Sequence, residues 1–112
     1  MTMIKAIALT KRKPGLSLEE FSRHYEEVHV PLALKYFPAI KRYVRNYVIT
    51  PPGVEGPEFD CISEYWYGNI EEQQAAINFW QSEAGQVIRD DEESFMDRRK
   101  TVFFLVEEKV TK

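Results

Sequence analysis

The sequence lacks the cysteines, the basic charge and the long apolar runs that mark several common classes of protein. Cys61 is the only cysteine among 112 residues, so the chain can form no internal disulfide and no thiolate set for a metal. The formal net charge is −3, whereas a nucleic-acid surface needs a clustered basic face. There is no run of about 18 apolar residues and no charged-then-apolar leader. These absences predict a cytoplasmic protein that binds neither nucleic acid nor a membrane.

Motifs that hold nucleotides or metal ions are also missing. The sequence contains no GxGxxG, no GxxxxGK[ST] and no HExxH segment. The acidic run at residues 90–93 lacks the spacing of a calcium loop, and we expect it to form a solvated helix face. The basic residues 98–100 balance this charge and are too few to indicate nucleic acid. We therefore expect neither a metal ion nor an organic cofactor.

What is present predicts a single domain of the α+β class over residues 1–112. Apolar residues make up 44% and charged residues 29%, as in ordinary globular proteins. Runs rich in β-branched and aromatic residues predict strands at 3–10, 40–50, 60–67 and 101–110. Apolar residues at every third or fourth position predict helices over 18–36, 70–80 and 87–96. The order βαββαβ, with an extra helical piece before the last strand, predicts a ferredoxin-like fold with a four-stranded antiparallel sheet.

Local signals mark where the helices begin and bend. Ser17 and Glu20 have the spacing of a capping box, and Asn69 with Glu72 is a second helix-start signal. Pro31 has no N–H for the carbonyl four residues earlier and crowds it. We therefore expect a kink, or the start of a second short helix, at this proline.

The last predicted strand is apolar on both of its faces. Residues 102–106 read VFFLV, whereas two helices can cover only one face of a four-stranded sheet. The simplest cover for the second face is the sheet of another subunit, so we expect a two-fold homodimer with the sheets face to face. The alternative is a monomer with one large, partly exposed apolar face.

His29 is the leading candidate for chemistry. It falls near the apolar side of the first helix, and a neutral imidazole can take or give a proton near pH 7. Tyr25 lies one turn earlier and can face the same cavity. The alternative is a histidine of the core or rim whose ring is satisfied by a carbonyl. We expect His24, five residues before His29, to lie off that face and to be solvated.

Glu64 and several aromatic residues are candidates for a binding site. Alternation places Glu64 on one strand face with Ile62 and Trp66, and an adjacent indole tends to raise the pKa of a carboxyl group. The alternative is an ion pair with Arg42 or Arg45 on the neighbouring strand. Aromatic walls suit a planar or polyketide-like ligand, although packing is their more frequent role. The candidate walls are Tyr43, Tyr47, Tyr65, Trp66, Tyr67 and Trp80.

The chain resembles the EthD family of the dimeric α/β-barrel superfamily over nearly its whole length. The segment 11–17 (KRKPGLS) is a moderately specific motif, followed by Glu20, Phe21 and the segment 29–33 (HVPLA). Further residues match the family pattern; each match is weak by itself, but together they strengthen the resemblance. They are Arg42, Tyr43, Asn46, Phe59, Asp60, Glu64, Tyr65, Trp66, Asp91, Glu92, Phe95 and Asp97.

The resemblance implies a ferredoxin-like subunit, a face-to-face dimer and a pocket between sheet and helices. It implies that His29 transfers a proton, with Asp97 as a second catalytic candidate and Trp66 as a supporting pocket residue. Tyr25 stands where many relatives have Trp, which would alter the shape of the pocket. The residues predicted to bind substrate are Tyr25, Tyr43, Glu64 and Trp66.

Two functions remain open at this point, and both involve a small hydrophobic or aromatic ligand. The first is a cofactor-free enzyme in which His29 abstracts an acidic proton from an aromatic, polyketide or lactone-like substrate. Dehydration, isomerisation, cyclisation and oxygenation all begin with that step. The second is a non-catalytic accessory or metabolite-binding protein that works beside an oxygenase, because the family is linked to the degradation of ethyl tert-butyl ether. Haem binding, found in some barrel relatives, is a third and weaker possibility.

Overall fold

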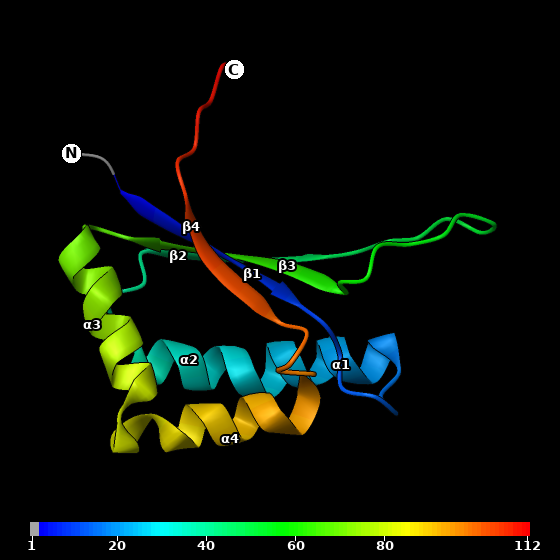
Figure 1. The fold of residues 1–112 in the computed structure, drawn as a ribbon, viewed down its shortest axis with the longest axis horizontal. Coiled ribbons are helices and arrows are strands. Elements are labelled where there is room, and N and C mark those ends of the chain that lie inside the picture. Colours follow the sequence, from blue (N-terminus) through cyan, green and yellow to red (C-terminus); the bar gives the residue numbers. More distant parts are fainter. Residues whose placement is uncertain (1–2) are drawn as a thin grey trace.

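Four antiparallel strands form one sheet in the spatial order β2-β3-β1-β4 (Figure 1). The computed structural model describes residues 3–112. The order, with one helical crossover between β1 and β2 and another between β3 and β4, is that of the ferredoxin-like fold. The fold class predicted from the sequence is therefore confirmed. The strands are β1 (Ile4–Thr10), β2 (Arg42–Tyr47), β3 (Cys61–Tyr67) and β4 (Val102–Val106).

The first crossover begins at the predicted capping box. In front of α1 (Leu18–His24), the hydroxyl of Ser17 accepts a hydrogen bond from the amide of Glu20 at 3.0 Å. The amide of Ser17 donates in return to the carboxylate of Glu20 at 2.9 Å. These two bonds satisfy amides that would otherwise be unpaired at the helix start.

A single π-helical turn interrupts this crossover. In η1 (Tyr25–His29), the chain takes one wide turn, and the amide of Val30 bonds to the carbonyl of Tyr25, five residues back. The chain then continues as α2 (Val30–Tyr36). Pro31 follows directly and has no N–H to maintain the α-helical pattern, so the predicted irregularity takes the form of a π-turn. Single π-turns often occur at functional sites because they change which side chains share a face.

The second crossover contains the predicted extra helical piece. α3 (Ile70–Gln81) begins at Asn69, whose side-chain oxygen accepts a hydrogen bond from the amide of Glu72 at 2.8 Å. A short 3₁₀ turn, η2 (Glu83–Gly85), leads into α4 (Gln86–Phe95). This last helix lies against η1 of the first crossover (Figure 1). Among residues 3–112, no helix combines the length and the apolar character that crossing a membrane requires.

The helices cover one face of the sheet and leave the other face open (Figure 1). On β1, the buried residues Ala6, Ala8 and Thr10 face the helices and alternate with more exposed ones. The opposite face is largely apolar, and its β4 side chains are 36–44% exposed. We call this surface the open sheet face. Its apolar residues are Ile7, Leu9, Val44, Ile62, Trp66, Val102, Phe104 and Val106.

Candidate functional site

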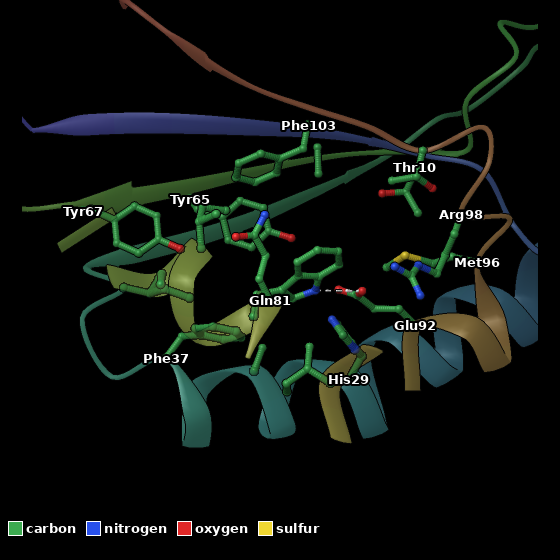
Figure 2. Close-up of a pocket in the computed structure, with 18 residues that line it drawn as sticks. Thr10, His29, Phe37, Tyr65, Tyr67, Gln81, Glu92, Met96, Arg98 and Phe103 are labelled. Atoms are coloured by element: carbon green, nitrogen blue, oxygen red, sulfur yellow. Dashed lines mark hydrogen bonds between the residues drawn. The ribbon is translucent and has the colours of Figure 1, made fainter. Parts of the chain in front are cut away.

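A cavity of about 330 Å³ lies between the covered sheet face and the helices α2, α3 and α4 (Figure 2). The apolar walls include Phe37 at the end of α2, Ile77 of α3 and Phe103 of β4. His29 and Glu92 contribute ionisable groups from η1 and α4. The cavity is large enough for a small organic molecule and combines apolar walls with few polar groups, as ligand sites usually do.

His29 is held at the wall of this cavity by Asp91. The ring is only 3% exposed, and its Nδ1 lies 2.8 Å from Oδ2 of Asp91 on α4. Since the carboxylate accepts the proton of Nδ1, the other nitrogen, Nε2, carries the lone pair of the neutral ring. Burial lowers the pKa of His29 and Asp91 only partly offsets this, so the ring is neutral at physiological pH. His29 is therefore an oriented base.

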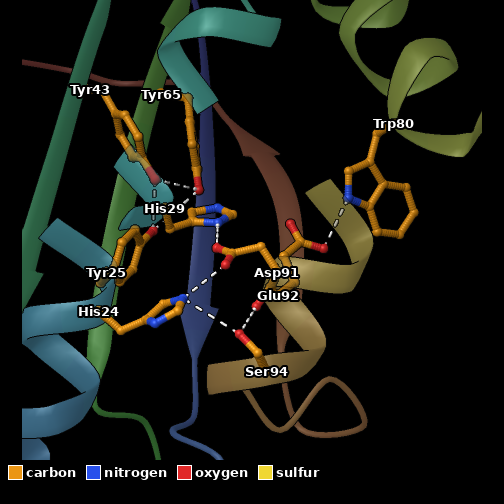
Figure 3. A network of polar contacts seen from close by, with 9 residues as sticks. All are labelled: His24, Tyr25, His29, Tyr43, Tyr65, Trp80, Asp91, Glu92 and Ser94. Atoms are coloured by element: carbon orange, nitrogen blue, oxygen red, sulfur yellow. Dashed lines mark hydrogen bonds and ion pairs between the residues drawn. The ribbon is translucent and has the colours of Figure 1, made fainter. Parts of the chain in front are cut away.

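His24 shares the same carboxylate, which the sequence did not predict. Its Nε2 lies 2.9 Å from Oδ1 of Asp91, so the two histidines bond to the two oxygens of one side chain (Figure 3). In an α-helix, with about 3.6 residues per turn, residues five apart point in different directions. The π-turn of η1 widens the spiral and brings both rings to Asp91. The expectation that His24 is solvated and off the face of His29 is therefore wrong.

The acidic run at residues 90–93 is likewise not a solvated face throughout. Asp91 and Glu92 point inward between the buried side chains of Ile88 and Phe95. Positions 88, 91, 92 and 95 lie on one face of an α-helix, so the spacing of Ile88 and Phe95 was a usable signal. Two carboxylates on an otherwise apolar helix stripe would have pointed to a buried polar site.

Glu92 contributes a carboxyl group to the wall of the cavity. The indole nitrogen of Trp80 donates a hydrogen bond to its Oε1 at 3.0 Å (Figure 3). Loss of solvent around the carboxyl raises the pKa of Glu92 to about 7, against the opposing effects of Trp80 and the nearby cation of Arg98. In the sequence, Glu92 stands out only as one residue of the EthD pattern and carries no predicted role.

Tyr25 and Tyr43 form a buried cluster of hydroxyls behind His29. Tyr43 donates to the hydroxyl of Tyr25 at 2.9 Å (Figure 3). Tyr25 also bonds to the hydroxyl of Ser63 at 2.6 Å. Burial raises the pKa of Tyr25 to about 12, so the phenol is neutral. Its ring meets that of His29 edge-on at 5.5 Å between centroids. Tyr25 therefore supports His29 from outside the cavity. Of the three linked tyrosines, Tyr25, Tyr43 and Tyr65, only Tyr65 lines the cavity.

Glu64 and Trp66 lie on the open sheet face, away from His29. Glu64 pairs with Lys5 of the neighbouring strand at 2.5 Å and accepts from Asn46 at 2.8 Å. The bond to Lys5 lowers the pKa of Glu64, so the predicted increase is wrong. The alternative of an ion pair is confirmed in kind, but its partner is Lys5, because Arg45 pairs with Glu26 on the covered face and Arg42 lies over the ring of Trp66. The structure does not bring Glu64 and Trp66 together with the cavity.

Asp97 lies in the turn after α4, next to the cavity but not in its wall. Its carboxylate accepts a hydrogen bond from the amide of Arg99 at 3.2 Å, and its own amide donates to the carbonyl of Lys11 at 2.8 Å. Both neighbours, Met96 and Arg98, do line the cavity. Asp97 therefore orders the turn that presents them.

Among residues 3–112, no three His, Cys, Asp or Glu side chains are arranged to ligate a metal ion.

Comparison with known proteins places the chain in a family and identifies structures with the same fold. Residues 13–99 match the family model described as EthD domain. A crystal structure of an ethyl tert-butyl ether d (EthD) family protein from Bacillus halodurans is 25% identical, with a TM-score of 0.72 over 96% of this chain and 100% of that one. No curated protein matches the sequence.

More distant structures share the fold alone. A protein from Bacteroides fragilis, described as dimeric, of unknown function and ferredoxin-like, is 11% identical with a TM-score of 0.62 over 94% of this chain and 95% of that one. The hydroxynitrile lyase of Passiflora edulis is 14% identical, with a TM-score of 0.63 over 97% of each chain. The fold therefore recurs in proteins that differ widely in sequence.

Proposed function

The chain belongs to the EthD family, and on this premise we propose that it is a cofactor-free enzyme that abstracts an acidic proton from a small, oxygen-bearing organic substrate. The observation that carries the proposal is the His29–Asp91 pair at the wall of an apolar cavity. A histidine whose Nδ1 is held by a carboxylate presents Nε2 as a base of fixed orientation. That arrangement suits proton abstraction at neutral pH.

In the proposed step, Nε2 of His29 removes a proton from a carbon next to a carbonyl group. The electron pair of the broken C–H bond forms a C=C bond, and the carbonyl oxygen takes up the negative charge. Hydrogen-bond donors on the cavity wall can hold that oxygen, and the lining includes Tyr65, Tyr67, Gln81 and Arg98. Asp91 stabilises the imidazolium that forms, because its carboxylate remains bonded to Nδ1.

The substrates that fit this cavity are aromatic, polyketide-like or lactone-like molecules. Rings from Phe37, Tyr67 and Phe103 surround an interior that is more apolar than polar. The enolate could go on to dehydration, isomerisation, cyclisation or oxygenation. The fold also occurs in a hydroxynitrile lyase, so it is compatible with a lyase reaction.

A binding or accessory role is the alternative, and the nearly complete burial of His29 favours it. A ring that is 3% exposed could serve packing alone, while the aromatic cavity holds a metabolite for another enzyme. The two roles differ in one measurable respect. An enzyme exchanges an acidic C–H proton of its ligand with solvent, whereas a carrier binds the ligand without exchange.

The assembly that we propose is a cytoplasmic homodimer formed through the open sheet face. Phe104 and Val106 are 39% and 36% exposed there, and so many exposed apolar side chains on one sheet face are unusual for a monomer, even with the Lys5–Glu64 pair among them. The ferredoxin-like neighbour from Bacteroides fragilis is described as dimeric, which supports this arrangement. A two-fold axis through the open sheet face would cover it with its own copy.

Deuterium exchange tests the proposed enzyme directly. Native mass spectrometry of freshly purified protein reports the dimer mass and any co-purified ligand. That ligand, and a panel of cyclic diketones and unsaturated lactones, is then incubated with the protein in D₂O while loss of the acidic C–H signal is followed by NMR. We expect His29→Ala to slow the exchange by about 10²-fold or more. Full exchange in His29→Ala would refute the enzyme, and binding without exchange in the wild type would establish the carrier.

A further inference from the structure

Glu92 is a carboxyl group of the cavity wall that takes no part in the proton abstraction by His29. It follows Asp91 on α4 and faces the same cavity as His29, and its carboxyl lies beside the indole of Trp80 (Figure 2). Nε1 of Trp80 donates to Oε1 at 3.0 Å. Because Oε1 accepts this bond, Oε2 is the oxygen that carries the proton when the carboxyl group is neutral. The indole thus orients Glu92 for proton transfer.

The surroundings of Glu92 allow it to exchange a proton near neutral pH. Loss of solvent, together with the negative charge of Asp91, raises the pKa of Glu92 to about 7. Two cations, Arg89 on the same helix and Arg98 in the turn after it, act in the opposite direction. Tyr65 faces Glu92 from β3, and burial raises its pKa so that it stays neutral. Glu92 is thus a mixture of acid and carboxylate at physiological pH.

A hydroxyl group in the cavity has no hydrogen-bond partner. Thr10 is fully buried and lines the cavity, and its Oγ1 is the one buried side-chain polar atom among residues 3–112 without a bond. Figure 2 shows Thr10 near Met96 and Arg98, with Phe37 at the opposite end of the cavity. A buried hydroxyl without a partner is unfavourable, and an oxygen atom of a ligand would supply the missing bond. This end of the cavity therefore suits the polar group of a ligand.

From this geometry we infer that Glu92 is the second proton-transfer group of the cavity and that the substrates are small enolisable carbonyl compounds with an apolar body. The apolar body lies toward Phe37, and the carbonyl oxygen lies at the end formed by Glu92 and Thr10. The inference rests on the proposed role of His29 as the base.

The two groups together give a balanced step. Nε2 of His29 takes the proton from carbon, the electron pair of that C–H bond becomes the C=C bond, and the carbonyl π pair moves to oxygen. The oxygen then takes the proton of Oε2 of Glu92. The substrate becomes a neutral enol, while the protein holds an imidazolium at His29 and a carboxylate at Glu92. No separated charge builds up on the substrate, which is what an acid beside the oxygen contributes.

The titration of Glu92 can be read without any substrate. The chain has two tryptophans, Trp66 and Trp80, and only the indole of Trp80 bonds to Glu92. In ¹⁵N-labelled protein, we expect the Trp80 indole signal to shift with a midpoint near pH 7, while the Trp66 signal serves as an internal reference. Glu92→Gln removes the titration, and Glu93→Gln, at the exposed neighbouring position, keeps it. A midpoint near the ordinary glutamate pKa of about 4.3 would overturn the inference, because Glu92 would then hold no proton at neutral pH.

A second measurement uses 2,4-dinitrophenolate, an aromatic oxygen anion that resembles an enolate and stays ionised at neutral and alkaline pH. Neutral Glu92 donates a hydrogen bond to this oxygen, whereas ionised Glu92 repels it. We expect wild-type affinity to fall by about tenfold or more between pH 6.5 and pH 9. Burial lowers the pKa of His29, and the ring is the same in Glu92→Gln, so the comparison of the two proteins cancels its contribution. In Glu92→Gln, whose amide donates at every pH, the affinity should be nearly constant.

The outcomes separate the two proposals. Wild-type binding that does not change with pH, or that changes equally in Glu92→Gln, would overturn the role of Glu92 and leave the role of His29 standing. If the wild type binds 2,4-dinitrophenolate neither at pH 6.5 nor at pH 9, the proposed ligand class is overturned, and with it the proposed function. Pronounced pH dependence in the wild type and in Glu93→Gln, but not in Glu92→Gln, would support both.

Discussion

Nδ1 of His29 and Oδ2 of Asp91 are 2.8 Å apart, although 62 residues separate them in the sequence. The contact joins the end of the π-turn to the middle of α4. It selects the tautomer of the imidazole and directs its basic nitrogen toward the cavity. The proposed chemistry depends on this pair.

Replacing Asp91 with Asn should slow proton abstraction by about 10- to 100-fold without emptying the cavity. The amide can donate to the ring, which favours the wrong tautomer, and it cannot stabilise an imidazolium. Deuterium exchange of a bound carbon acid measures the effect. Asp90→Asn is the matched control because Asp90 is exposed one position earlier on the same helix. Equal losses in both variants would contradict a specific role for Asp91.

Replacing Ala76 with Phe should weaken ligand binding and leave every ionisable group in place. Ala76 lines the cavity from α3, and a phenyl ring there would occupy part of the 330 Å³. We expect the affinity for 2,4-dinitrophenolate to fall by about tenfold or more, as judged by equilibrium dialysis. Ala75→Phe places the same ring on the exposed side of α3. Normal binding by the Ala76 variant would mean that the ligand binds elsewhere.

Replacing Phe104 with Glu should convert the proposed dimer to a monomer. The side chain lies at the open sheet face, where a carboxylate would be buried against its own copy in the two-fold assembly. Sedimentation equilibrium measures the mass. Val54→Glu is the control, because Val54 is 56% exposed in the loop between β2 and β3. A wild type that sediments as a monomer would refute the assembly outright.

Replacing Thr10 with Val should raise the free energy of unfolding by about 1 kcal/mol. The substitution keeps the shape of the side chain and removes a buried hydroxyl that has no partner in the ligand-free protein. Urea denaturation at neutral pH measures the change. Thr101→Val is the control, since the hydroxyl of Thr101 donates to the carbonyl of Asp97 at 3.0 Å and its loss should destabilise. Destabilisation by the Thr10 substitution would show that its hydroxyl is satisfied.

The pH dependence of stability should carry a contribution from Glu92. Its pKa is about 7 in the folded protein and about 4.3 when unfolded, so between these values the folded state binds more protons. The free energy of unfolding therefore falls as pH rises through this window, by up to about 3 kcal/mol relative to Glu92→Gln. Urea titrations of the wild type and of Glu92→Gln from pH 4 to pH 8 give the difference in free energy of unfolding. His29 is present in both proteins, so its contribution cancels. Parallel curves would contradict burial of the carboxyl group.

The sequence by itself determined the elements and their order, because those signals are local. Ser17 and Asn69 each bond to an amide three residues away, so the spacing of the cap is readable in the chain. Runs rich in β-branched and aromatic residues likewise identified the strands, and Pro31 marked the irregular turn. His29 was singled out because an ionisable ring on an apolar face is unusual at any position.

Only the tertiary structure decided which polar groups meet. His24 and His29 share Asp91 because a π-turn changes the helical spacing, and α-helical periodicity points them apart. Glu64 meets Lys5 because β1 lies beside β3 in the sheet, whereas β2 was the neighbour assumed from the sequence. Pairing across the sheet and between helices depends on how distant segments pack. No residue spacing within one segment encodes that arrangement.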